Sequence, residues 1–177
     1  MAPMQPRLTV ISIAAFCFCG LTNAQTDTSV TGAIRHVVQE VNRSKDYETR
    51  TLENEEFLEQ MTDGGGDLTG LFRSGRLVKI IERIGLSSCV NITEYYFQNS
   101  QLVFASVQGR EFAYVDSTAS FDPGVQDVTL EARFYFHENN LVKADLKGST
   151  RCGGAPTMEW AAVYQTEALR LKNLLMR

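Results

Sequence analysis

The chain has 177 residues, of which 44% are hydrophobic and 21% are charged, and it contains only 4 prolines. This composition is typical of a globular protein and excludes a disordered tail protein, a collagen and a coiled-coil rod. The formal net charge of −4 argues against a general nucleic-acid binder, because such proteins carry a basic patch.

Residues 1–24 have the pattern of a secretory signal peptide. Arg7 supplies the positive start, a mostly apolar stretch runs from Leu8 to Leu21, and small residues precede Gln25 at the expected cleavage site. The alternative is a membrane anchor, but the stretch is shorter than the roughly 20 residues that span a bilayer. We therefore predict a secreted or periplasmic protein. Its mature chain, residues 25–177, is expected to form one domain without a transmembrane segment.

Residues 29–43 and 157–176 have the periodicity of amphipathic helices. The apolar stripe of the first segment consists of Val30, Ile34, Val37, Val38 and Val41, and that of the second consists of Trp160, Tyr164, Leu171 and Leu175. His36 points away from the first stripe and is expected at the surface. We expect both helices to cover the apolar face of a sheet.

Residues 68–147 predict a run of antiparallel strands, with clear examples expected at 76–84, 90–97, 101–107 and 112–115. Between Val128 and Phe136 apolar residues alternate with polar ones, which indicates a half-buried strand. We predict an α+β fold: an antiparallel β-meander of five to seven strands, with an N-terminal and a C-terminal helix packed on it. The alternative is a strongly curved half-barrel with a cavity. Three glycines, 64–66, mark a turn or hinge.

One eight-residue pattern occurs three times, starting at Leu71, Tyr96 and Tyr135: an apolar residue and Phe, then four mostly polar residues, then Leu-Val. It predicts either the same hairpin used three times or a true repeat. Further local motifs are Thr62-Asp63-Gly64-Gly65-Gly66, Leu77-Val78-Lys79-Ile80, Glu94-Tyr95-Tyr96-Phe97 and Arg133-Phe134-Tyr135-Phe136. In these motifs the chain resembles small uncharacterised exported bacterial proteins, and its turns are loosely similar to MORN-type hairpins. The resemblance implies no activity and no functional residue.

Cys89 and Cys152 are the cysteines that remain after removal of the leader. An even pair in an exported protein suggests a disulfide, and two separate thiols are the alternative. A disulfide closing this loop would stabilise the fold by roughly 4 kcal/mol in the chain-entropy model. Because no cysteine or histidine has zinc spacing, we predict no metal site and no cofactor.

Catalytic signatures are absent from the sequence. The histidines are His36, on the polar side of a helix, and His137, in an expected hairpin loop, and no G-x-S-x-G motif occurs. The acidic side chains of residues 53–59 are expected to be solvated. We therefore predict no enzymatic activity and no catalytic residue.

Arg133, Tyr135 and Lys143 are expected on the polar face of the sheet, where tyrosine and basic residues suit a partner surface. The alternative for this face is ordinary solvated sheet. We therefore expect an exported non-enzymatic module that binds an unknown protein or cell-envelope partner and no nucleic acid.

Two other functions stay open. One is a small apolar-ligand carrier with a pocket between the curved sheet and the C-terminal helix, lined by residues such as Phe104, Phe134 and Trp160. The other is a hydrolase that uses isolated carboxylates, which a buried carboxylate with a raised pKa inside a cleft would favour.

Overall fold

A computed structural model describes residues 22–177. Helix α1 (Thr22–Arg43) precedes the strands and helix α2 (Trp160–Leu175) follows them, and a short 3₁₀ turn, Asn54–Glu56, lies between the first two strands. The strands are β1 (Glu48–Glu53), β2 (Gly66–Arg73), β3 (Arg76–Leu86), β4 (Cys89–Gln98), β5 (Gln101–Val115), β6 (Ser120–His137) and β7 (Asn140–Gly148). The predicted signal peptide, residues 1–24, lies outside the described residues except for its last three.

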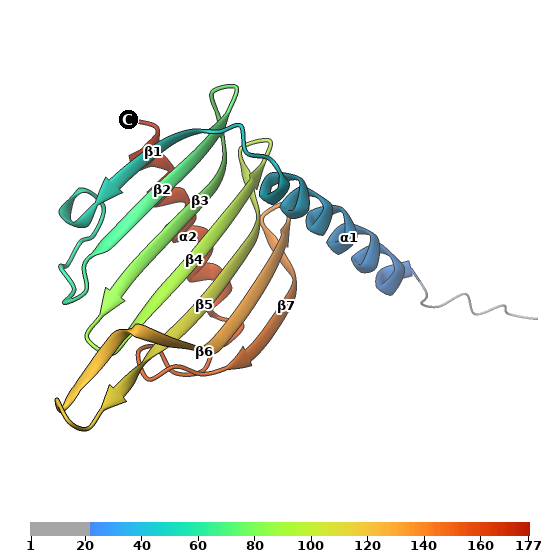
Figure 1. The fold of residues 1–177 in the computed structure, drawn as a ribbon. Coiled ribbons are helices and arrows are strands. Elements are labelled where there is room, and N and C mark those ends of the chain that lie inside the picture. Colours follow the sequence, from blue (N-terminus) through green and yellow to red (C-terminus); the bar gives the residue numbers. More distant parts are fainter. Residues whose placement is uncertain (1–21) are drawn as a thin grey trace, which may run out of the picture.

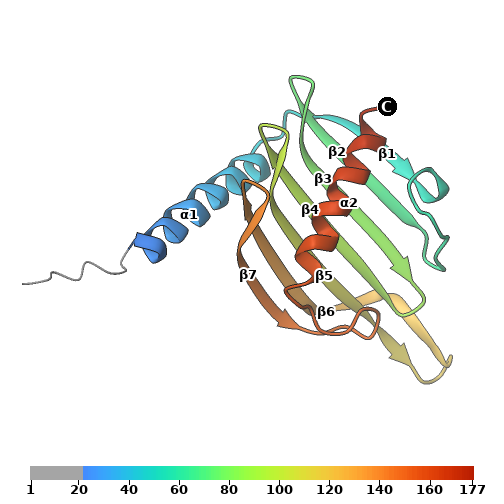
Figure 2. The ribbon, with the colours of Figure 1, turned by 180° about the vertical axis from the view of Figure 1, so that it is seen from behind.

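The seven strands form one antiparallel sheet in which every strand pairs with its neighbours in sequence, in the order β1 to β7. The sheet is curved, and α2 runs diagonally across one of its faces (Figures 1 and 2). The predicted α+β meander with two flanking helices is therefore confirmed. Strand β1 was not expected, because nearly all of its side chains are exposed and so show no alternation.

The main core lies between the sheet and α2. Its fully buried side chains include Leu68, Ile80, Tyr95, Phe134, Phe136, Leu171 and Leu175. The predicted alternation of β6 holds from Leu130 to Phe136, whose apolar members all face this core. Val128 is exposed, because the far end of the β5–β6 hairpin extends beyond the neighbouring strands (Figure 1).

The three copies of the eight-residue pattern form three similar hairpins. Each has a two-residue turn in which both residues have positive φ: Ser74-Gly75, Asn99-Ser100 and Glu138-Asn139. Such turns match the twist of the flanking strands. After each turn the register skips one residue, and the bulged residues are Val78, Val103 and Val142. All three valines pack in the cluster around α1, so the repeated pattern supplies part of the surface on which this helix packs.

Helix α1 packs on the face of the sheet opposite α2. Its buried residues Ile34 and Val41 belong to a second core with Tyr96, Phe104 and Tyr135. The ring of Phe104 lies 5.6 Å from that of Tyr96 and 4.9 Å from that of Tyr135. The expectation that both helices cover the same face is wrong, because these aromatic residues make the hairpin end of the other face apolar as well.

The glycine-rich loop before β2 is fixed against the end of β3. The backbone N–H of Gly64 donates to the carbonyl of Gly85, and the N–H of Gly85 donates to the carbonyl of Gly65. A Cβ atom at position 64 would lie 2.5 Å from the carbonyl carbon of Gly85, which is too close for any other residue. The glycines therefore permit a close backbone approach at this turn.

Candidate functional site

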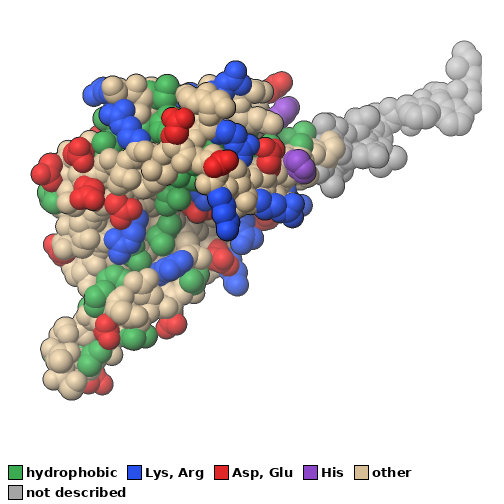
Figure 3. All heavy atoms as spheres, turned by 45° about the horizontal axis from the view of Figure 1, so that its top comes forward, with side chains coloured by type: hydrophobic (Ala, Val, Ile, Leu, Met, Phe, Trp, Pro, Cys, Tyr) green, Lys and Arg blue, Asp and Glu red, His purple; other side chains and the backbone are tan. Residues whose placement is uncertain are grey.

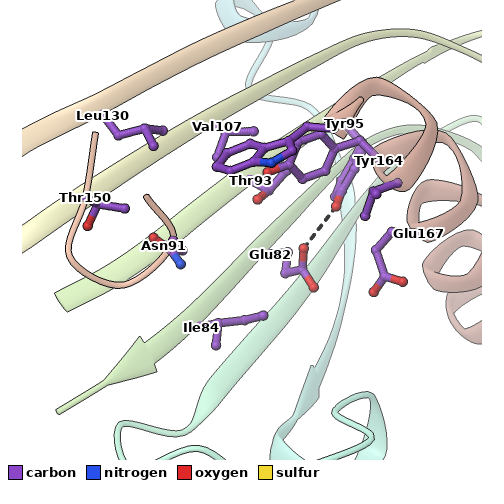
Figure 4. A pocket seen from close by; sticks show the side chains of 13 residues that line it. Glu82, Ile84, Asn91, Thr93, Tyr95, Val107, Leu130, Thr150, Tyr164 and Glu167 are labelled. Carbon is purple, nitrogen blue, oxygen red and sulfur yellow. Dashed lines mark hydrogen bonds between the residues drawn. The ribbon is translucent and has the colours of Figure 1, made fainter. Parts of the chain in front are cut away.

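A pocket of about 260 Å³ lies between α2 and the sheet (Figure 4). Strands β3 to β6 form its floor, and α2 and the loop that follows β7 form its walls. Val163, which is 62% exposed, and the exposed Gly153 mark the side on which the pocket meets solvent. Most of the lining is apolar or aromatic, which is typical of a small-molecule site.

Glu82 lies at the base of this pocket. It is in phase with Ile80 and Ile84 along β3, so the pleat turns its side chain toward α2, and it is only 5% exposed. The hydroxyl of Tyr95, on β4, donates a hydrogen bond of 3.0 Å to its carboxylate. Burial, and then the negative charge of Glu167, raise the pKa of Glu82 to about 7, although the hydrogen bond from Tyr95 opposes this shift.

A second carboxylate, Glu167, reaches the pocket from α2. Arg170, one turn further along the helix, donates to both of its carboxylate oxygens, over 2.9 Å and 2.5 Å. The same guanidinium donates to the backbone carbonyl of Phe57, which fixes its position. The charge of Glu167 is therefore compensated within the protein, whereas Glu82 forms no ion pair with any described residue.

A cluster of aromatic rings lies beside the two carboxylates. The ring of Tyr164 lies 6.2 Å from that of Tyr95, 6.1 Å from that of Trp160 and 5.5 Å from that of Phe134. Burial raises the pKa of both Tyr95 and Tyr164, so both hydroxyls stay protonated and can donate hydrogen bonds.

The loop after β7 supplies the remaining wall, through Thr150 and Gly153. A disulfide between Cys89 and Cys152, with a Cα–Cα distance of 6.5 Å, ties this loop to the start of β4. Arg151 also pairs with Glu111 on β5, through its backbone N–H and its guanidinium. These contacts fix the wall on the sheet, so the predicted pair of cysteines has a direct structural relation to the pocket.

The predicted binding face is only partly open. Tyr135 and Lys143 are register partners and Arg133 lies on the same side of β6, so the three residues are brought together. However, Tyr135 is only 4% exposed, since α1 covers it, and the prediction that it is exposed is wrong. Lys143 forms an ion pair of 2.9 Å with Asp145. Figure 3 shows basic and acidic side chains next to one another on the visible side of the molecule.

The residues suggested for a ligand pocket have three different positions. Trp160 lines the pocket, and Phe134 lies in the core in contact with Tyr164. Phe104 is on the opposite face, beneath α1, so its expected place in the lining is wrong. Glu82 was missed, although an acidic residue at the apolar phase of Ile80 and Ile84 was a signal that could have found it.

Other candidate groups stay apart. Both histidines are exposed, and Figure 3 shows histidine side chains on the surface in purple. Among residues 22–177 no group of three or more His, Cys, Asp or Glu side chains is arranged to hold a metal ion. In the same range, no helix combines the length and the apolar character needed to cross a membrane.

Comparison of the chain with protein-family models, with curated proteins and with solved structures gives no significant match. The resemblance to MORN-type hairpins and to small exported proteins therefore stays a prediction.

Proposed function

We propose that this protein is a non-enzymatic binding protein for a small, largely apolar molecule, which occupies the pocket between α2 and the sheet. The observation that carries the proposal is the pocket itself, with the buried carboxylate of Glu82 at its base. The pocket opens to solvent on one side, so a small molecule can enter it, and a polar group that is buried at its base needs partners. A bound ligand would fill the space and give Glu82 a second partner.

The size of the pocket limits the ligand. Drug-sized ligands occupy sites of roughly 300–1,000 Å³, and benzene fits a dry cavity of about 150 Å³. A volume of about 260 Å³ therefore suits one ring with a short substituent, or a short aliphatic chain. Val107 and Leu130 on the floor and Trp160 on the wall would contact its apolar part.

Trp160 provides a direct test, because it is the single tryptophan of the chain and lines the pocket. Single-ring compounds such as benzyl alcohol are titrated into the full-length protein while tryptophan fluorescence is recorded. We expect a saturable change in the wild type and a loss of binding in Gly153→Leu. A Cβ at position 153 would lie 3.6 Å from Thr150 and 3.9 Å from Trp160, which are ordinary contacts with two lining residues, and we expect the rest of the leucine side chain to occupy the pocket.

The matched control is Gly32→Leu on α1, where a new Cβ has no heavy atom within 4 Å. This variant carries the same substitution far from the pocket and should bind as the wild type does. The proposal fails if the compounds do not bind, or if both variants bind them equally well.

A ligand carrier is preferred over a protein-binding module because α1 covers Tyr135, the aromatic residue of the predicted face. Arg133 and Lys143 remain partly exposed, with acidic neighbours Glu131 and Asp145. Their role in partner binding stays a hypothesis. Export to the periplasm or to the medium is part of the proposal and rests on the leader pattern.

A second candidate function is acid–base catalysis by Glu82, favoured by its pKa of about 7 inside the pocket. A group with such a pKa can accept and donate protons near neutral pH. Hydrolysis of small esters or glycosides by the wild type, and its loss in Glu82→Gln, would support this candidate. Binding without turnover in the wild type would support the carrier.

A further inference from the structure

The pocket has acidic but no basic lining. Glu82 reaches it from β3 and Glu167 from α2, and Figure 4 shows both side chains in the same site. No Lys, Arg or His is among the described residues that line it. Arg170 lies next to the pocket, but both carboxylate oxygens of Glu167 and the carbonyl of Phe57 already engage its guanidinium.

Glu82 is the carboxylate without a direct ion pair, although the positive charge of Arg170 acts on it through space and lowers its pKa. One of its oxygens accepts the hydrogen bond from Tyr95, and no other hydrogen bond and no ion pair to it is formed within residues 22–177. A buried carboxylate with one neutral partner is poorly stabilised in its charged form. Its second oxygen is therefore available to a donor that enters the pocket.

Aromatic side chains line the same space. The rings of Tyr95 and Trp160 each lie about 6 Å from that of Tyr164, and all three side chains line the pocket. Aromatic faces carry partial negative charge and attract cations, and this attraction is stronger where water is excluded. The carboxylate and the rings thus both favour a positively charged ligand.

We infer that the ligand of this pocket is a small organic cation, an ammonium group on a single ring or a short apolar chain. The inference rests on the proposed function and names the class of its ligand. The ammonium group donates to the carboxylate of Glu82, and the apolar part contacts Val107, Leu130 and Trp160. An anion would be repelled by the acidic lining, and a neutral ligand would leave Glu82 without a direct ion pair.

Binding of such a cation is coupled to a proton. The titratable or charged groups that face Glu82 are Tyr95 on β4 and Tyr164, Glu167 and Arg170 on α2. Without ligand, Glu82 is half protonated near pH 7. An ammonium ion binds the carboxylate form, so affinity rises as the pH rises through 7, and binding near neutral pH releases a proton from Glu82.

The test compares benzylamine, benzyl alcohol and benzoate, which share one ring and differ in charge. Each is titrated at about pH 8 and low salt, with Trp160 fluorescence and calorimetry as readouts. We expect benzylamine to bind roughly tenfold more tightly than benzyl alcohol, because it gains a charge-assisted hydrogen bond, and benzoate to bind most weakly.

Glu82→Gln removes the charge with little change in shape. We expect it to abolish the preference for the amine, so that benzylamine and benzyl alcohol bind with similar affinities. The control, Glu131→Gln, removes a carboxylate that pairs with Arg133 and Lys147 on the opposite face, and it should keep the preference for the amine.

The failures of the two proposals are distinguishable. Equal affinities for benzylamine and benzyl alcohol, both weakened by Gly153→Leu, would overturn the cation inference and leave the proposed pocket function standing. Lack of binding by all three compounds would overturn both. If Glu82→Gln does not fold, the wild type decides: a benzylamine affinity that does not rise between about pH 6 and about pH 8 contradicts the inference.

Discussion

The hydroxyl of Tyr95 donates a hydrogen bond of 3.0 Å to the carboxylate of Glu82, and α2 covers both side chains. Through this pair, the free energy of unfolding depends on whether Glu82 is protonated and on whether a ligand occupies the pocket. The carboxylate is held at the base of the pocket by a neighbouring strand, and its protonation depends on what else occupies that space.

The stability of the ligand-free protein should fall as the pH rises. The pKa of Glu82 is raised from 4.5 to about 7, so between these values the folded state holds a proton that the unfolded state has lost. Its contribution is therefore full below about pH 4.5, declines above that value and is lost as the pH rises through about 7. The difference is roughly 3 kcal/mol in the free energy of unfolding.

Urea unfolding at about pH 5 and about pH 8 measures this difference. In Glu82→Gln the corresponding part of the pH dependence should disappear, and the variant should be more stable than the wild type at the higher pH. Glu131→Gln, on the opposite face, is the control. Parallel pH profiles for the wild type and Glu82→Gln would contradict the assignment.

Replacement of Tyr135 by alanine should reduce stability strongly. Its ring packs against Phe104 beneath α1 and is 4% exposed, so truncation removes core contacts at a cost of roughly 3–5 kcal/mol. Tyr114→Ala is the matched control, because that ring is 53% exposed on the β5–β6 hairpin. Similar small losses in the two variants would show that α1 does not cover Tyr135 in solution.

The turn between β6 and β7 should accept a stabilising exchange. Glu138 and Asn139 both have positive φ, which costs energy for a side chain such as glutamate. The exchange of Glu138-Asn139 for Asn-Gly, the preferred sequence of this turn type, should stabilise the fold by roughly 1 kcal/mol in thermal or urea unfolding. The same exchange at Lys45-Asp46, where φ is ordinary, should give no gain. A loss of stability at 138–139 would contradict the turn assignment.

The bond between Cys89 and Cys152 should stabilise both the fold and the pocket. Its sequence separation of 63 residues corresponds to roughly 4 kcal/mol in the chain-entropy model. Alkylation of protein recovered from an oxidising compartment, followed by intact mass measurement, should modify neither cysteine until a reductant is added. Reduction should then lower the unfolding temperature and weaken benzyl alcohol binding, because Cys152 holds the loop that forms one pocket wall. Modification of both thiols without reductant would contradict this prediction.

The parts of the fold that were predictable are those with regular periodicity. The stripe of α1 packs on the sheet, with Ile34 and Val41 buried and its other residues partly buried, and the alternation of β6 places its apolar side in the core from Leu130 onward. Strand β1 has polar, exposed side chains on both sides, so its place in the sheet follows from backbone pairing with β2 alone.

The placement of α1 could not be predicted from alternation, because bulges interrupt it. At Val78, Val103 and Val142 one extra residue shifts the phase and directs a valine to the α1 side. Alternation alone predicts a sheet with one apolar and one polar face, whereas the hairpin end of this sheet is apolar on both faces.

The candidate site was largely missed, since its main residues come from separate elements. Glu82 and Glu167 are 85 positions apart in the chain, and the diagonal path of α2 across the sheet brings them to one pocket (Figure 2). A pocket between the sheet and the C-terminal helix, with Trp160 in its wall, is predictable from the amphipathic pattern of that helix. That pattern does not identify which carboxylate would be buried there.

Binding of a small ligand between α2 and the sheet can be located by amide chemical-shift mapping during a benzylamine titration. We expect shifts that saturate and that concentrate at Glu82, Tyr95, residues 150–153 and residues 160–167. Shifts that concentrate instead around Tyr135 and α1, or no saturable shifts at all, would contradict binding in this pocket.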